Sequence, residues 1–398
     1  MTAKERILAA VQGKPCDCIP FVPRLDNWYR ANKLNGTLPD RFKNATLQEL
    51  TDECGFGYHA INPEYLDLRT PDGDTHIGLG LYDINLTPYY VKLHNVDVHV
   101  SRENNGKTHV EYDTPKGKIS TTVIYNDQMR HSGITISVIL EHAIKSYQDF
   151  PAMAYILENA EVVPNYEKLA EFRQNFMGNR GLTVGLAGVY SSPFHYLVKE
   201  LMAVDTFYYE MDDHLEEMEA FADQIEPYLL KLVYAAANAP CDAVLYGSNF
   251  DSYVTAPSMF EEYILPYLQK VSAIFHDHGK YHICHTDGEN IGLLNKYPRC
   301  GFDIADSICP SPMTKCSLKQ VYDTFDGKIT IWGGIPSICM LKDTMDQKTF
   351  EKTMEELIAS VGSGRHMIFS IADTLPPAAD FDRVFYIQKK LQEFGPVR

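Results

Sequence analysis

The second half of the chain alternates between two kinds of apolar pattern. Short, continuous apolar segments predict buried strands, and longer segments with apolar residues every three or four positions predict helices. The predicted strands are 181–188, 242–246, 281–285, 302–308, 328–332 and 366–372. The clearest helices are 215–229 and a long one at 257–278, which Pro266 is expected to kink. Strand–helix alternation of this length indicates a parallel sheet with crossover helices.

The first part of the chain is organised differently. Residues 2–12 predict a helix, and 19–23 predict a short first strand. Residues 91–125 instead alternate polar and apolar side chains in three runs, separated by the turns Asn104-Asn-Gly106 and Pro115-Lys-Gly117. This alternation is typical of a small antiparallel meander. We interpret 91–125 as an insertion in one larger domain that spans 1–398.

Polar residues follow nearly every predicted strand, which favours one architecture over another. The segment Lys280–Asn290 contains two histidines, a cysteine and two carboxylates, and 303–309 and 366–373 also end in reactive residues. Barrel enzymes assemble their sites from the carboxyl ends of many strands. We therefore predict an α/β fold of the closed (β/α)8 TIM-barrel class rather than an open sheet.

Side chains directly after the predicted strands are candidates for one shared pocket. Arg24 and Asp26 follow the first strand, where they belong either to the pocket or to a cap over the barrel mouth. Arg24 suits the anchoring of a substrate carboxylate or phenolate. The later candidates for orienting a substrate are Tyr246, Asn249, Asp251 and Glu289.

The composition of the chain argues against several classes of protein. The 398 residues carry a formal net charge of −17, which argues against a nucleic-acid binder. Nine scattered cysteines without a Cys-x-x-Cys pair fit reduced thiols in a cytoplasmic protein better than a disulfide framework. No run of about 18 apolar residues occurs, so we expect no transmembrane span, and the amphipathic N-terminal segment is not typical of a signal peptide.

Five motifs, in this order and spacing, resemble those of the uroporphyrinogen decarboxylase superfamily, and within it the branch of cobalamin-dependent methyltransferases. The motifs are Gly13-Lys-Pro-Cys-Asp17 through Pro20, Asp113-Thr-Pro-Lys-Gly117, Pro257-Ser-Met-Phe-Glu-Glu-Tyr-Ile-Leu-Pro266, Gly279 followed by His285-Thr-Asp-Gly288, and Ile331-Trp-Gly-Gly-Ile335. The resemblance covers most of the chain and implies a TIM barrel.

The resemblance also implies a set of metal ligands. Thiol-alkylating members hold zinc with the His and Cys of a His-x-Cys motif and with a later Cys near the last strand. By spacing, the histidine is His285, and the two cysteine positions fall on Asp287 and Asp373. Zinc accepts histidine and carboxylate ligands, so a His285/Asp287/Asp373 site remains chemically reasonable. The loss of both thiolates makes a zinc-bound thiolate acceptor doubtful.

A second register offers an alternative set of ligands. His282 and Cys284 also form a His-x-Cys pair, with Cys339 as a third ligand. On a strand, residues 282 and 284 share one face, whereas His285 lies on the other. The spacing from Gly279 and to Gly288 favours His285, and the alternative pair is expected to pack in the barrel wall.

The resemblance implies a corrinoid-dependent methyltransferase. Such an enzyme passes a methyl group from a small methylated substrate to the Co(I) of a corrinoid on a partner protein, and our preferred reaction is O-demethylation of a phenyl methyl ether. The leaving oxygen then needs a proton or a cation, from His285 or from zinc on the three ligands. The alternatives are a porphyrinogen-type decarboxylase, which the single arginine in Pro23–Trp28 disfavours, and a non-catalytic barrel. The oligomeric state stays open.

Overall fold

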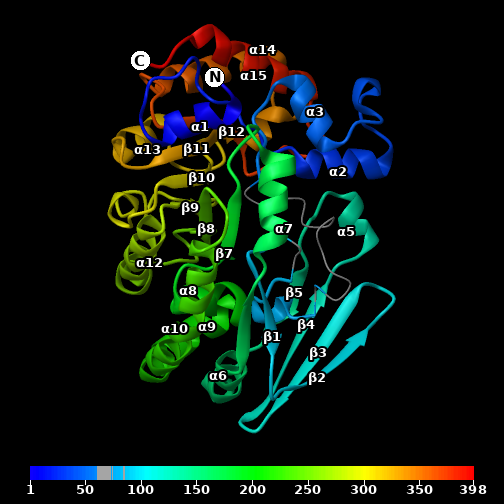
Figure 1. Ribbon diagram of the computed structural model, residues 1–398, viewed down its shortest axis with the longest axis vertical. Helices are drawn as coiled ribbons and strands as arrows, with labels where there is room; N and C mark the ends of the chain where they lie inside the picture. Colours follow the sequence, from blue (N-terminus) through cyan, green and yellow to red (C-terminus); the bar gives the residue numbers. More distant parts are fainter. Residues whose placement is uncertain (61–72, 74, 84–85) are drawn as a thin grey trace.

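The computed structural model describes residues 1–60, 73, 75–83 and 86–398 of the chain (Figure 1). Its centre is a six-stranded sheet in which neighbouring strands are parallel and follow the order of the sequence. The strands are β7 (Val184–Gly188), β8 (Ala243–Ser248), β9 (Tyr281–His285), β10 (Ile304–Ile308), β11 (Thr330–Pro336) and β12 (Met367–Ala372). The molecule is therefore a mixed α/β protein, as the alternating pattern predicts, and all six carboxyl ends lie at one edge.

Backbone hydrogen bonds continue beyond both edges of this sheet. The amide of Val22 donates to the carbonyl of Phe369 in β12, and the amide of Phe369 donates to Pro20, both at 2.9 Å. The amide of Gly57 then donates to Phe21 at 3.0 Å. Tyr58 in turn donates to Arg180, shortly before β7, at 2.8 Å. Two extended segments near 20–22 and 57–58 thus lie between β12 and the start of β7.

The strands sort their side chains between two apolar clusters. The inner cluster takes alternate residues from the sheet, among them Leu245, Ile283, Ile304, Trp332 and Ile368, together with Val22 and with Ile7 and Ala10 of α1 (Ala3–Val11). The other cluster packs the opposite face of the sheet against helices. Because both faces are covered by apolar groups, the strands are buried along nearly their whole length, which accounts for their continuous apolar sequences.

Helices surround this sheet (Figure 1). Those that alternate with the strands of the sheet are α10 (Leu215–Ala237), α12 (Leu265–Asp277), α13 (Leu318–Phe325), α14 (Gln347–Ser360) and α15 (Phe381–Phe394). Others are α2 (Asp26–Asn35), α3 (Leu47–Cys54), α5 (Asp127–His131), α6 (Phe150–Glu158), α7 (Tyr166–Glu171), α8 (Pro193–Tyr196) and α9 (Val204–Asp213). The predicted helix 257–278 is divided into α11 (Pro257–Met259), a π-helical turn and α12, and Pro266 lies in the first turn of α12. Within the described residues, no helix is long and apolar enough to cross a membrane.

Two smaller antiparallel sheets lie before β7. One contains β2 (Asp97–Arg102), β3 (Lys107–Thr114), β4 (Gly117–Ile124) and β5 (Val138–Glu141), in that order. The predicted meander agrees with β2, β3 and β4, but β5 joins the sheet from outside 91–125. The other sheet pairs β1 (Tyr89–Leu93) with β6 (Ala160–Pro164). The four-stranded sheet projects from the main body (Figure 1).

Candidate active site

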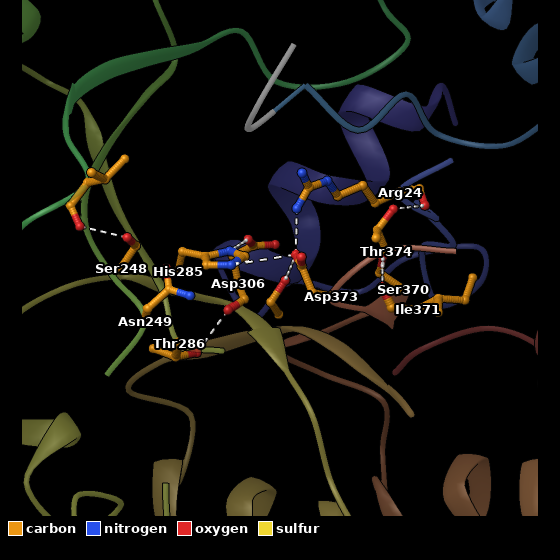
Figure 2. A network of polar contacts seen from close by, with 12 residues as sticks. Arg24, Ser248, Asn249, His285, Thr286, Asp306, Ser370, Ile371, Asp373 and Thr374 are labelled. Carbon is orange, nitrogen blue, oxygen red and sulfur yellow. Dashed lines mark hydrogen bonds and ion pairs between the residues drawn. The ribbon is translucent and has the colours of Figure 1, made fainter. Parts of the chain in front are cut away.

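His285 is the last residue of β9 and is directed into the site by a neighbouring carboxylate. Asp306 is its register partner on β10, and the two side chains meet, with Nδ1 of His285 2.6 Å from Oδ2 of Asp306 (Figure 2). The other oxygen of Asp306 is 3.3 Å from Nε2 of His59. Both carboxylate oxygens are therefore engaged, and the Nδ1 contact leaves Nε2 of His285 facing Asp373.

Asp373 directly follows β12 and gathers polar groups around one oxygen. Oδ1 of Asp373 accepts a hydrogen bond from Nη1 of Arg24 at 2.5 Å and one from the hydroxyl of Ser307 at 3.1 Å (Figure 2). The same oxygen lies 3.5 Å from Nε2 of His285. Residues from the first extended segment, β10 and the end of β12 thus meet the histidine of β9 at one edge of the sheet.

Three side chains in this cluster have the geometry of a metal site. His285, Asp287 and Asp373 each offer a ligand atom, and these atoms all lie within 4.8 Å of one another. They are the three residues that the family resemblance implies as ligands. Metal-bound histidines commonly give their second nitrogen to a carboxylate, as His285 does to Asp306. The described residues therefore fit a divalent cation of the zinc class.

The charges of the cluster follow from burial and from pairing. Burial lowers the pKa of His285, but the hydrogen bond to Asp306 and the charge of Asp373 outweigh it, so the net shift is upward. Burial raises the pKa of Asp287. Burial would also raise the pKa values of Asp306 and Asp373, yet both are lowered, by the two histidines around Asp306 and by Arg24 and His285 beside Asp373. A proton can thus be held on Nε2 of His285, between ionised carboxylates.

A cavity of about 410 Å³ opens beside this cluster. His285, Asp373 and Arg24 lie in its wall, together with Asn249 and Lys199, whose Nζ donates to Oδ1 of Asn249 at 3.3 Å. The remaining wall includes the aliphatic side chains Ile77, Ile134, Ile136, Ile139, Val189 and Leu245, the aromatic Tyr82, and the buried Glu200. Asn27, Thr135, Ser137 and Ser248 add polar groups to the same wall. The cavity therefore combines charged groups at the His285 end with a wall of mixed aliphatic and polar side chains, and it suits a small molecule that has both apolar and polar parts.

The four other predicted substrate residues, Asp26, Tyr246, Asp251 and Glu289, all lie outside the cavity wall. The ring of Tyr246 is fully buried on the far face of β8, 6.3 Å from the ring of Tyr267 in α12. A bulge between Leu245 and Ser248 changes the alternation of β8, and Gly247 within it has a φ of 95°. Leu245 and Ser248 consequently line the cavity while Tyr246 packs in the core. Its predicted role in orienting substrate has no geometric basis.

Three predicted acidic residues likewise support the site from outside the cavity. Asp26 accepts from Nε of Arg24 at 3.1 Å and thereby fixes the guanidinium. Asp251 accepts from the amides of Tyr253 and Glu289 at 2.8 and 3.0 Å. The buried carboxylate of Glu289 accepts from backbone amides in two different loops. These three carboxylates hold backbone and side chains in place, so direct contact with a substrate is not their role in this structure.

In the alternative ligand set, His282 and Cys284 are already engaged by contacts within the protein. His282 is fully buried, with Nδ1 2.7 Å from the hydroxyl of Ser272 and Nε2 2.9 Å from the carbonyl of Tyr246. Cys284 points to the same carbonyl. Among the described residues, the set that can hold a metal contains neither of them, nor Cys339. The alternation of β9 therefore places His282 and Cys284 on one face of the strand and His285 on the other, as expected.

Several site residues were not singled out from the sequence. Asp306 lies inside a predicted strand, where a lone carboxylate suggests packing or a turn rather than a site. His59 follows no predicted strand, and Ser307 and Lys199 belong to no motif. The sequence offered one signal for Asp306, a carboxylate in the middle of the largely apolar segment 302–308, because a carboxylate in a buried strand needs a partner.

Comparison with known proteins agrees with this architecture. The family model described as uroporphyrinogen decarboxylase (URO-D) matches residues 135–394, which are 260 of the 398 residues. No curated protein sequence gives a significant match. Among solved structures, a methyltransferase from Methanosarcina mazei superposes with a TM-score of 0.54 at 14% identity, with 99% of each chain covered, which shows a shared fold. Because the family model spans well over half of the chain, this protein belongs to the uroporphyrinogen decarboxylase family.

Proposed function

We propose that this protein is a methyltransferase that moves a methyl group from a small methylated substrate to the Co(I) of a corrinoid on a partner protein. Our preferred substrate is a phenyl methyl ether. The observation that carries the proposal is the convergence of His285, Asp287 and Asp373 beside a cavity at the strand ends. Membership of the family and the shared fold with a methyltransferase support it.

We also infer that the sheet closes into the (β/α)8 barrel. The two extended segments near 20–22 and 57–58 would be the first two of the eight barrel strands, followed by β7 to β12. The inner apolar cluster, to which Val22, Leu182 and strands on opposite sides of the sheet contribute, supports closure. In a closed barrel the carboxyl ends surround one mouth, and His285 and Asp373 would face each other across it.

The ether chemistry follows from the donor set. Displacement of a methyl group from oxygen leaves a phenolate or alkoxide, whose developing charge must meet a proton or a cation. A zinc ion held by His285, Asp287 and Asp373 would supply a Lewis acid to that oxygen. Without thiolate ligands this site is harder and more oxygen-seeking than the His/Cys/Cys site of the thiol-alkylating relatives. We therefore favour an oxygen leaving group over a sulfur nucleophile.

The protein's own residues prepare the leaving-group end of the cavity. Asp306 fixes the ring of His285 and favours its protonated form. Without a metal, Nε2 of His285 would therefore hold the proton that meets the leaving oxygen, as the alternative to zinc on the same nitrogen. Arg24 is buried and paired with Asp26 and Asp373, so its guanidinium adds positive charge at a fixed position. The aliphatic residues of the wall, such as Ile139, Val189 and Leu245, would give the methyl group apolar contacts.

A decarboxylase is the second candidate, since the family model bears that description. A polycarboxylate substrate needs several unpaired cations. Besides His285, the described cavity wall contains two cationic side chains, Arg24 and Lys199, and Arg24 is already bound by two carboxylates. Asp287 and Asp373 would repel further negative charge. The methyltransferase reading accounts better for these groups, and a non-catalytic barrel would leave the buried pairing of His285 with Asp306 unexplained.

The test is anaerobic spectrophotometry of Co(I) corrinoid, as free cobalamin and on a panel of corrinoid proteins. Aryl methyl ethers, methylamines and methyl thiols are the donors, and uroporphyrinogen decarboxylation is assayed in parallel. We expect conversion of Co(I) to methyl-Co(III) with aryl ethers. His285→Ala and Asp287→Ala should abolish it, whereas His94→Ala, at an exposed histidine outside the cavity, should not. Decarboxylation without any methyl transfer would contradict the proposal.

A further inference from the structure

An exposed apolar collar lies on the loops that follow the strands of the site. It comprises Tyr253, Val254, Ile291, Met313 and Ile338, which are 68%, 38%, 40%, 49% and 37% exposed. The collar residues come from the loops after β8, β9, β10 and β11. They are five of the fifteen large exposed apolar residues in the described part of the chain. Because the strands are parallel, these loops share one edge with His285, so the collar borders the site.

Hydrogen bonds within the molecule tie the collar loops together. The carboxylate of Glu289 accepts from the amide of Ile291 at 2.9 Å and from the amide of Lys315 at 2.8 Å. Asp251 accepts from the amides of Tyr253 and Glu289. In the next pair of loops, the hydroxyl of Ser337 contacts the sulfur of Met313 at 3.4 Å. Hydrogen bonds thus connect neighbouring loops of the collar, which makes it one surface rather than a set of independent loop tips.

The charge of the collar differs from that of the chain. The whole protein has a net charge of −17, yet the acidic side chains Asp251 and Glu289 turn inward to backbone amides. Lys315 is exposed, and its ammonium donates a hydrogen bond to the hydroxyl of Tyr253. The surface thus presents apolar groups around a positive charge, which complements an apolar patch with an acidic rim.

We propose that the collar is the docking surface for the corrinoid protein, with Lys315 meeting acidic residues on it. This inference rests on the proposed function and names the surface through which that function operates. Attack at the methyl carbon requires the cobalt to reach the cavity, so the carrier must cover the mouth. Ile134 and Ile136, exposed residues in the cavity wall, extend the apolar surface there. Anchoring by large side chains around the opening keeps water out during transfer.

The experiment compares two acceptors, free cob(I)alamin and the corrinoid protein that supports the fastest methylation, using full-length protein and the active donor. The variants are Tyr253→Glu and Met313→Glu, singly and together. Tyr234→Glu is the matched control, because Tyr234 is similarly exposed (47%) and packs near His278, at the opposite edge of the sheet. We expect the collar variants to raise the KM for the carrier at least about tenfold. Turnover with free cob(I)alamin and the KM for the donor should stay within about twofold.

Charge reversal gives a second readout. Lys315→Glu should raise the KM for the carrier and reduce its dependence on ionic strength, because an attractive pair is replaced by a repulsive one. An unchanged carrier KM in the collar variants would overturn the docking proposal while leaving the proposed function intact. A lowered sedimentation coefficient in those variants, with an unchanged carrier KM, would instead assign the collar to a second copy of the chain. No methylation of either acceptor by the unsubstituted protein would overturn the proposed function and the docking proposal together.

Discussion

Asp306 is the residue on which the orientation of His285 depends, because its two oxygens meet His285 and His59. Asp306→Asn keeps the volume but removes the charge that fixes Nδ1. We predict a zinc affinity roughly 10–100-fold lower, the usual effect of losing such a partner. Chelator competition with purified protein measures this. Asp303→Asn is the control on the same segment, because Asp303 binds His276 and the amide of His282 instead. Equal losses in both variants would contradict the role of Asp306.

The pH dependence of stability tests the charge of His285. Its pKa in the folded protein is raised, chiefly by Asp306 acting against burial. The resulting stabilisation is therefore complete below the unfolded value of about 6.5 and is lost as the pH rises through the folded pKa. Urea unfolding of metal-free protein should show that His285→Gln costs most near pH 6 and progressively less toward pH 9. A cost that stays constant or grows over this interval would refute the assignment.

Individual residues were predictable where a motif or a strand end marked them. His285, Asp287 and Asp373 come together as the motif spacing implies. Tyr246 was misplaced because it was chosen for its place near a strand end without regard to its face: Leu245 faces the inner cluster, so Tyr246 alternates to the far face. The bulge between Leu245 and Ser248 then returns Ser248 to the cavity side, and a bulge leaves no clear trace in a short apolar run. Asp306 was missed because its partner lies on another strand, and single-chain periodicity does not contain that pairing.

At the scale of the element, β11 passes very close to the end of β10. Gly333 has a φ of 152°, and a Cβ there would lie 2.7 Å from the carbonyl oxygen of Ile308. Gly333→Ala should therefore destabilise the protein by about 1–3 kcal/mol, because backbone atoms cannot rotate away as a side chain can. It should also lower activity, since Ile308 follows Asp306 and Ser307.

Denaturant unfolding measures this cost, and Gly36→Ala provides the comparison. Gly36 ends α2 with a φ of 68°, but a Cβ there meets nothing within 4 Å. Its substitution should cost about 1 kcal/mol from backbone conformation alone and should leave activity unchanged. Equal costs and equal activities for the two variants would show that the contact with Ile308 is unimportant.

The parallel strands were the most predictable elements. They are buried on both faces, so their sequences are almost continuously apolar and stand out from their surroundings. The long helix 257–278 was predicted as one element, but its π-helical turn at Phe260–Ile264 depends on backbone hydrogen bonding that apolar periodicity does not report. β5 was not predicted, because its apolar side chains alternate toward solvent rather than toward the core.

At the scale of the whole molecule, the net charge of −17 implies repulsion within the folded state. Salt reduces the range of that repulsion from about 20 Å near 20 mM to about 4 Å near 500 mM. We expect the melting temperature to rise over this range in sodium chloride and, equally, in choline chloride. A rise in sodium chloride alone would indicate specific cation binding, and a fall in both would mean that attractive pairs dominate.

The contact between Arg24 and Asp373 joins residues 349 positions apart, and His285 and Asp287 lie between them in the sequence. During synthesis, at roughly 5–20 residues per second, about 20–70 s separate the emergence of these two partners from the ribosome. The three proposed ligands are therefore all present only after residue 373 has been made. Nascent chains that stop before residue 373 would present His285 and Asp287 without the third ligand. On the proposed function, metal binding would then report that Asp373 has been made and has met His285 and Arg24 in the folded protein.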